Sequence, residues 1–159
     1  MRPFPETSPG PGLAVRPTEL RDIPSLYHVR ASTRQNPVSR DQLLEWGITP
    51  ESIAEGFETG EFQGMVCESG EAVVGFCTGN TRTGEVLVLA VLPEFENRKV
   101  GLTLLEGVVA ELRRSNVPSI WLGCSPNPES RSYGFYRANG WGETGQKTET
   151  GDDILVLLP

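Results

Sequence analysis

The residues with the clearest chemical potential lie in the stretch VLPEFENRKVGLTLLE, residues 91–106. A short polar turn there places Asn97, Arg98, Lys99 and Gly101 just where an amphipathic helix is expected to begin. A helix N-terminus carries unpaired backbone N–H groups and the positive end of the helix dipole. Together with the apolar strand expected before it, this turn predicts a binding site for an anion, most often a phosphate group.

The elements that position this turn follow from the hydrophobic pattern. A near-continuous apolar run over 85–92 predicts a strand that is buried on both faces. The helix expected over about 102–114 carries one apolar stripe, formed by Leu105, Val108, Val109 and Leu112. A further strand over 120–123 predicts that strand, helix and strand form a right-handed parallel crossover. The turn would then lie at the carboxyl end of a central strand, where such sheets bind ligands.

The remaining predicted elements complete a sheet flanked by helices. Further strands are expected over 13–16, 62–67, 72–77 and 153–158. Helix N-caps are expected at Thr18, Ser39 and Thr49, and a last helix is expected over 130–138. This order predicts the α/β (α+β) class: a single domain over 12–159 with a mixed, mostly antiparallel central sheet, preceded by a flexible proline-rich tail over 1–11.

Composition limits the classes of function. The chain of 159 residues has 37% hydrophobic content, which suits one globular domain. The formal net charge of −7 argues against a general nucleic-acid binder. An acidic surface would suit cationic partners such as amines, although simple solubility is the more ordinary explanation. No apolar run approaches the roughly 18 residues of a membrane span, and the N-terminus has no secretory signal pattern.

The cysteines and the histidine argue against a metal site. Cys67, Cys77 and Cys124 match no metal or redox spacing, and His28 is the one histidine of the chain. These residues supply too few ligands for a zinc site. The unpaired cysteines indicate a reduced, cytoplasmic protein.

Two motifs, VLPEFENRKVGLTLL (91–105) and GFYRANGW (134–141), resemble the GNAT superfamily of acyl-CoA-dependent N-acyltransferases. The first resembles the family's pyrophosphate loop, V-x-P-x-x-Q/R-x-x-G-x-G/A, and the second its F/L-Y-x-x-x-G-F/W ending. The resemblance spans about 13–158 and implies the family's fold. The loop departs from the pattern at Glu96, where Gln or Arg is usual, and at Lys99, where the first Gly is usual. A left-handed backbone at Lys99 would cost ~1–2 kcal/mol.

The resemblance also implies a cofactor and the residues that hold it. The donor would be acetyl-CoA, with no metal involved. The backbone of Leu89, Ala90 and Val91 would pair with the pantetheine arm, although their side chains suit an apolar core equally well. The pyrophosphate would be wrapped by the loop residues Asn97, Arg98, Lys99, Val100, Gly101, Leu102 and Thr103.

The same resemblance implies two catalytic residues. An alkylammonium group has a pKa of about 10 and must lose a proton before it attacks a thioester. Glu85 matches the general base of histone-type members, with Asp152 and Asp153 as weaker competitors. Tyr136 matches the tyrosine that protonates the CoA sulfur. The alternatives are that Glu85 is a solvated carboxylate at a strand end and that Tyr136 belongs to the core.

The sequence therefore predicts an N-acetyltransferase that transfers an acetyl group from acetyl-CoA to a primary amine of a small molecule or peptide by direct attack. The alternative is a non-catalytic GNAT-fold protein that binds CoA or another ligand, which the altered residues Glu96 and Lys99 motivate. The partners expected are acetyl-CoA and an amine acceptor, with a homodimer left open, and neither nucleic acid nor a membrane.

Overall fold

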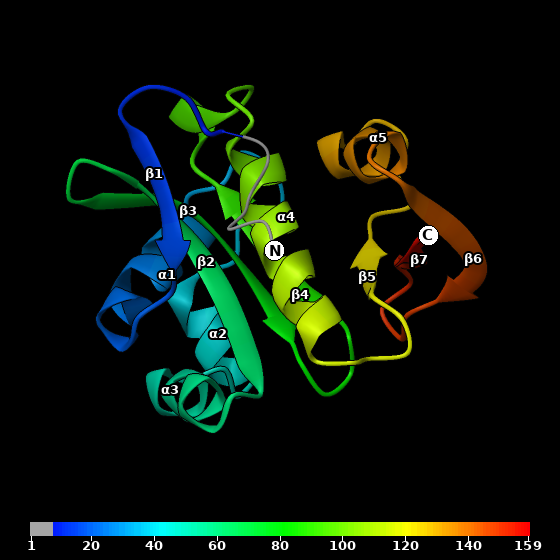
Figure 1. Ribbon diagram of the computed structural model, residues 1–159, viewed down its shortest axis with the longest axis horizontal. Coiled ribbons are helices and arrows are strands. Elements are labelled where there is room, and N and C mark those ends of the chain that lie inside the picture. Colours follow the sequence, from blue (N-terminus) through cyan, green and yellow to red (C-terminus); the bar gives the residue numbers. More distant parts are fainter. Residues whose placement is uncertain (1–7) are drawn as a thin grey trace.

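Among residues 8–159, which the computed structural model describes, seven strands form two antiparallel sheets that meet at one corner (Figure 1). The first sheet has the order β1-β2-β3-β4 and the second has the order β5-β7-β6. The strands are β1 (Leu13–Pro17), β2 (Phe62–Ser69), β3 (Ala72–Asn80), β4 (Val86–Val91), β5 (Trp121–Cys124), β6 (Trp141–Lys147) and β7 (Asp153–Leu157). Residues 1–7 of the predicted tail lie outside the described residues.

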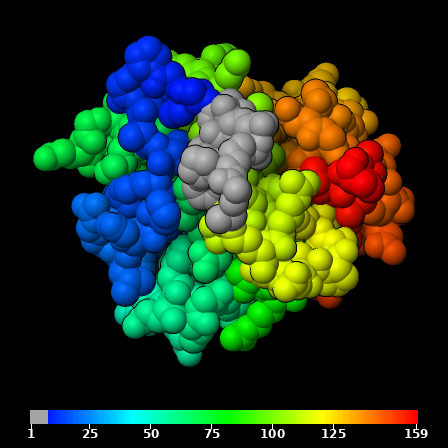
Figure 2. All heavy atoms as spheres, viewed as in Figure 1, coloured from blue at the N-terminus to red at the C-terminus, as the bar shows by residue number. Residues whose placement is uncertain are grey.

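Helices cover both faces of the first sheet and one face of the second. The helices are α1 (Ile23–Ala31), α2 (Arg40–Glu45), α3 (Pro50–Thr59), α4 (Val100–Arg114) and α5 (Arg131–Ala138). In the ribbon view, α4 lies between the first sheet and the second sheet (Figure 1), and in the space-filling view the β2–β3 turn projects from the left side (Figure 2). The architecture confirms the predicted α/β class with a mostly antiparallel sheet.

The core follows from the alternation of side chains along the strands. Met65 and Cys67 of β2 face α4, whereas Val66 between them packs with Leu26 and Val29 of α1. The larger apolar cluster runs from α4 across to the second sheet and includes Leu122 and Leu155. The helix α4 is therefore buried against both sheets, and its N-terminus is fixed relative to the gap between them.

The two sheets are joined where β4 begins and β5 begins. Glu85 and Trp121 form an isolated parallel bridge, and the Trp121 N–H donates to the Gly84 carbonyl at 3.1 Å. The Trp121 indole Nε1 donates to the Thr83 carbonyl at 3.0 Å. Within residues 8–159 no further pairing joins β4 to β5, so the two strands diverge from this bridge towards their carboxyl ends. The parallel direction predicted for these two strands is confirmed, and their separation leaves one edge of β4 open.

Two features differ from the sequence prediction. The sequence pattern predicts no strand over 141–147, but the structure places β6 there. The pattern missed it because Trp141 is the one buried residue of this edge strand, so the strand shows no hydrophobic alternation. The pattern also predicts Thr18 as a helix N-cap, which is wrong. The Thr18 N–H still donates to the Gly64 carbonyl in continuation of β1, and a 3-10 turn (Leu20–Asp22) precedes α1. Pro24 fixes the start of α1, since proline fits the first helical turn.

Other local predictions are confirmed. The Ser39 hydroxyl accepts a hydrogen bond from the Gln42 N–H at 3.1 Å, and the Thr49 hydroxyl accepts one from the Ser52 N–H at 3.0 Å. Gly140 follows α5 with a φ of 93°, as expected for a helix end. In the part of the chain that the structure describes, no helix combines the length and the apolar character that a membrane crossing requires.

Candidate functional site

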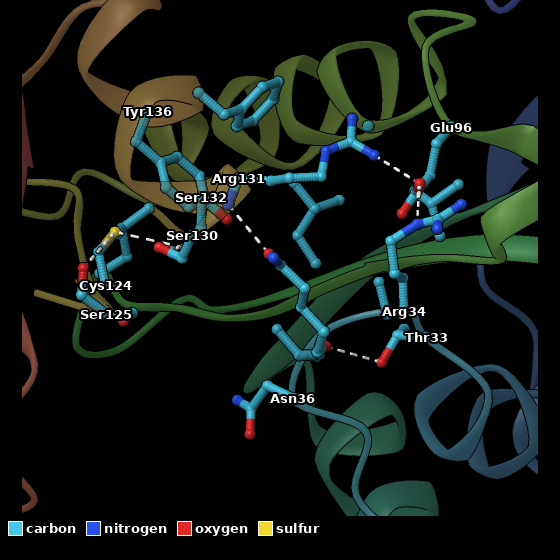
Figure 3. Close-up of a pocket in the computed structure, with 18 of the residues that line it drawn as sticks. Thr33, Arg34, Asn36, Glu96, Cys124, Ser125, Ser130, Arg131, Ser132 and Tyr136 are labelled. Carbon is cyan, nitrogen blue, oxygen red and sulfur yellow. Dashed lines mark hydrogen bonds and ion pairs between the residues drawn. The ribbon is translucent and has the colours of Figure 1, made fainter. Parts of the chain in front are cut away.

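A cleft of about 1290 Å³ lies between the diverging strands β4 and β5 (Figure 3). Its walls come from β4, the β4–α4 turn, the end of β5, the start of α5, and the loop that follows α1. The volume exceeds the roughly 300–1,000 Å³ of ordinary small-molecule pockets, so the cleft suits a long ligand. Apart from the end of α1, the loop after it and Asp152 on the β6–β7 turn, the walls belong to the strand–helix–strand unit, the loop after it or the helix after that loop.

The open edge of β4 offers backbone hydrogen-bonding groups to this cleft. The Leu92 N–H donates to the Val74 carbonyl on β3 at 2.9 Å. Because backbone groups alternate sides along a strand, those of Val91 and Leu89 point away from β3, towards the cleft. Ala90 also lines the cleft, but its backbone groups belong to the side that faces β3. Of the three residues predicted to contact the pantetheine arm, Leu89 and Val91 thus have the free backbone groups.

A bulge in β4 lies next to this edge. The pairing of β3 with β4 shifts register, because Thr78 opposes Val88 while Gly79 opposes Val86, so that Leu87 has no partner. The Leu87 side chain is 42% exposed and lines the cleft. Bulges bend the strand that carries them and often lie beside active sites. The bend contributes to the divergence of β4 from β5.

The β4–α4 turn presents the N-terminus of α4 to the cleft. Asn97 and Lys99 both have a φ of 63°, and Lys99 is the N-cap residue in a left-handed conformation without a side-chain cap. The left-handed conformation considered from the sequence is therefore present at Lys99. A Cβ at Gly101 would meet protein atoms no closer than 3.9 Å. The protein itself therefore leaves room at Gly101, as a turn that receives a ligand requires.

The predicted loop residues do not all reach the cleft. Asn97, Lys99, Val100, Gly101 and Leu102 line it. Arg98 is absent from its lining, and its guanidinium lies 5.3 Å from the ring centroid of Phe95. Thr103 is fully buried, and both its N–H and its hydroxyl donate to the Lys99 carbonyl, at 3.0 and 2.8 Å. Thr103 therefore closes the first turn of α4 and has no N–H to offer an anion.

Glu96 lies at the mouth of the cleft between two arginines. Its Oε1 accepts from Arg34 Nε at 2.9 Å and from an Arg131 guanidinium nitrogen at 2.6 Å, and its side chain is 14% exposed (Figure 3). The Arg131 N–H donates in turn to the Gln35 side-chain oxygen at 2.9 Å. This Glu96 cluster (Arg34, Glu96 and Arg131) joins the loop after α1, the β4–α4 turn and the start of α5. The two guanidinium groups neutralise the Glu96 carboxylate, which the sequence places beside the predicted phosphate site.

Tyr136 forms part of the inner wall of the cleft. Its side chain is 9% exposed, and its ring packs edge-on against Phe135 and Trp141, at centroid distances of 5.1 and 5.9 Å. Burial raises the pKa of its phenol, and the nearby thiols of Cys77 and Cys124 raise it further. The phenol therefore remains protonated at neutral pH. Within residues 8–159 its hydroxyl forms no hydrogen bond, and Tyr136 is a core aromatic that also lines the cleft.

The carboxylates named as candidate bases are placed differently by the structure. Glu85 forms the bridge to Trp121 where the cleft closes and does not line the cavity, although burial raises the pKa of its carboxyl. Asp153 is occupied by ion pairs with Lys147 and Arg137. Asp152 lines the cleft. The structure thus does not bring Glu85 and Tyr136 together in one wall.

Several cleft residues carry no signal in the sequence. Arg34, Gln35 and Asn36 lie in an irregular loop far from the motifs, and Arg131 begins α5. Only the fold brings them to the β4–α4 turn. Among the described residues no group of His, Cys, Asp and Glu side chains is arranged to hold a metal ion.

Comparisons with known proteins agree with this geometry. The sequence model of the acetyltransferase (GNAT) family matches residues 23–141. The fold resembles the PaiA N-acetyltransferase of Thermoplasma acidophilum in complex with coenzyme A, with a TM-score of 0.74, 18% identity, and coverage of 92% of this chain and 99% of that chain. No curated protein sequence gives a significant match.

Two further solved structures share the fold. An acetyltransferase from Streptococcus agalactiae has a TM-score of 0.74 at 16% identity, covering 94% of this chain and 100% of that one. YncA from Salmonella typhimurium, solved with its cofactor acetyl-CoA, has a TM-score of 0.63 at 17% identity, and the match covers 91% of each chain.

Proposed function

The chain belongs to the acetyltransferase (GNAT) family, and on that premise we propose that it transfers an acetyl group from acetyl-CoA to a primary amine of a small molecule or peptide. The observation that supports this best is the continuity of the cleft. The free backbone groups of Leu89 and Val91 lead directly to the open N-terminus of α4 at Val100–Leu102. A ligand that runs along this edge would place a hydrogen-bonding arm against β4 and a phosphate at the helix start.

The transfer proceeds by direct attack of the amine on the thioester. An N–H of the open β4 edge stabilises the oxyanion that forms on the carbonyl. The C–N bond forms, the C–S bond breaks, and Tyr136 donates its proton to the departing sulfur. Burial raises the pKa of the Cys124 thiol that lines the cleft, so this thiol stays neutral and is a poor competing nucleophile. Glu85 can act as base only through water, because it lies outside the cavity lining.

The second candidate function is binding without turnover. The ligand would be CoA or another molecule. The Glu96 cluster motivates this alternative, because Arg34 and Arg131 are paired with a carboxylate at the mouth of the cleft and are less available to the phosphates of a donor. The three cysteines are unpaired and buried. Free thiols are compatible with a reducing compartment, and we therefore place the protein in the cytoplasm. A homodimer stays a prediction.

Acetyl-CoA titration by calorimetry, followed by a screen of primary amines for release of free CoA thiol, tests the proposal. Saturable binding and amine-dependent thiol release are expected. Binding without thiol release from any amine would favour the binding protein. Failure to bind at millimolar acetyl-CoA would overturn the acetyltransferase.

Replacing Glu96 with glutamine is expected to tighten acetyl-CoA binding roughly fivefold, or about 1 kcal/mol, because it removes a carboxylate beside the phosphate site and leaves Arg34 and Arg131 free to pair with phosphate. The gain should shrink at high salt, since the charges are partly exposed. Calorimetry at two salt concentrations measures both effects. Glu94→Gln, an exposed change in the same turn, is the control and should leave affinity unchanged. Weaker binding by Glu96→Gln would instead mean that Glu96 positions the arginines for the phosphates.

A further inference from the structure

The basic residues that line the cleft and the lining residue Asp152 are carried by different elements. The lining arginines and the lysine are Arg30, Arg34, Lys99 and Arg131, which lie on the last turn of α1, the loop after it, the β4–α4 turn and the start of α5. The turn between β6 and β7 contributes one charged group, Asp152. Basic groups suit an anionic donor, and a carboxylate on a separate element suits a cationic acceptor.

Asp152 is the one lining carboxylate that is both sheltered and unpaired among residues 8–159. The other lining acids are Glu96, which the two arginines occupy, and Glu129, which is exposed on the β5–α5 loop. The Asp152 carboxylate forms no hydrogen bond or ion pair with a described residue, whereas its neighbour Asp153 is held by Lys147 and Arg137. Its charge is therefore available to a ligand.

The backbone holds Asp152 in place. The Thr148 N–H donates to the Asp152 carbonyl at 2.9 Å, and the Asp152 N–H donates to the Thr148 hydroxyl at 3.0 Å. Gly151 completes the turn with a φ of 93°, which favours glycine. The turn closes on itself through these bonds, so the side chain projects from a fixed backbone.

A glycine on β5 packs directly against the turn that carries Asp152. A Cβ at Gly123 would lie 3.2 Å from the Thr148 methyl, a tight contact, and 3.7 Å from Asp152 Oδ2, an ordinary contact. Gly123 and Cys124 face opposite sides of β5, because side chains alternate along a strand. Cys124 packs in the cluster that contains Tyr136. Asp152 and Tyr136 therefore flank the end of β5 from its two faces.

We infer that Asp152 is the residue that contacts the ammonium group of the acceptor and accepts its proton, which makes the acceptor a cationic primary amine; this rests on the proposed function. One ammonium proton passes to the Asp152 carboxylate, and the nitrogen lone pair then forms the C–N bond. The C–S bond breaks, and the sulfur takes the Tyr136 proton. The proton on Asp152 and the second N–H proton pass to water, which reprotonates Tyr136, so that one proton is released in each turnover.

Asp152→Asn tests this inference against two comparison variants, Glu85→Gln and Glu149→Gln. Glu149 lies on the same β6–β7 turn but is exposed, so it controls for loss of charge from that turn. With the best amine of the screen, Asp152→Asn should lower kcat/KM for the amine roughly 10- to 100-fold, because the proton acceptor is lost. Calorimetric affinity for acetyl-CoA should not change. Asp152→Glu should restore part of the rate.

The outcomes separate the inference from the function on which it rests. Equal kcat/KM values for wild type and Asp152→Asn, or a loss found only in Glu85→Gln, would overturn the inference and leave the acetyltransferase intact. A binding measurement covers the case in which no amine turns over. Benzylamine should bind the CoA-loaded wild type more tightly than benzyl alcohol does, and Asp152→Asn should abolish that preference. A preference that persists in Asp152→Asn would also overturn the inference.

Discussion

Tyr136→Phe is expected to lower kcat about 10²-fold, the lower end of the effect of removing a positioned proton donor. The phenol lines the inner wall of the cleft, and burial raises its pKa, so the wild-type donor is protonated throughout the neutral and mildly alkaline range. Activity should therefore show no alkaline loss that is due to Tyr136 between about pH 7 and 10, the ordinary tyrosine pKa. Steady-state rates of CoA thiol release across this range give the measurement.

The stability of this variant distinguishes a chemical role from a structural one. The Tyr136 hydroxyl has no hydrogen-bond partner among residues 8–159, so its removal leaves no buried group unpaired and should change the unfolding free energy by less than about 1 kcal/mol. Tyr133→Phe, on the same helix but outside the cleft lining, is the control and should retain full activity. A Tyr136→Phe enzyme within twofold of wild type would assign Tyr136 to the core alone.

The sequence was sufficient where local chemistry decides the structure. The apolar stripe of α4, the helix caps at Ser39 and Thr49, and the turn at Asn97–Gly101 each depend on neighbours within a few residues. For this reason the fold class and the turn at the start of α4 could both be predicted. Leu89, Ala90 and Val91 were predicted from the family resemblance, and the pairing of β4 with β3 decides which of them have free backbone groups.

The parts that could not be predicted depend on contacts between distant segments. The partners of Glu96 are Arg34 and Arg131, from separate loops, whereas neighbouring Arg98 is stacked on Phe95 instead. The role of Thr103 depends on the bond of its hydroxyl to the Lys99 carbonyl, which a motif alone does not reveal. The edge strand β6 buries one residue and therefore shows no hydrophobic alternation. In these cases the charge of a residue, or its position in a motif, does not reveal which distant residues its side chain contacts.

Gly84→Ala is expected to destabilise the protein by about 3 kcal/mol and to weaken acetyl-CoA binding. The φ of Gly84 is 81°, a conformation that costs an L-residue ~1–2 kcal/mol. A Cβ there would lie 2.1 Å from the Ser119 carbonyl oxygen, a backbone atom that cannot rotate away. Relieving such an overlap costs a further ~1–3 kcal/mol. For a domain of this size, the melting temperature should fall by roughly 10 °C in a thermal unfolding experiment.

The effect on binding follows from where Gly84 lies. Its carbonyl accepts the Trp121 N–H that joins β5 to the first sheet, so a displacement of Ser119 moves β5 relative to β4 and changes the width of the cleft. Gly70→Ala is the matched control. Its φ is 62°, but a Cβ there meets nothing within 4 Å, so it should lose only the backbone term, about 1 kcal/mol, and bind acetyl-CoA normally. Equal losses of stability in the two variants, with acetyl-CoA affinity unchanged in both, would show that the contact between Gly84 and Ser119 does not set the separation of the strands.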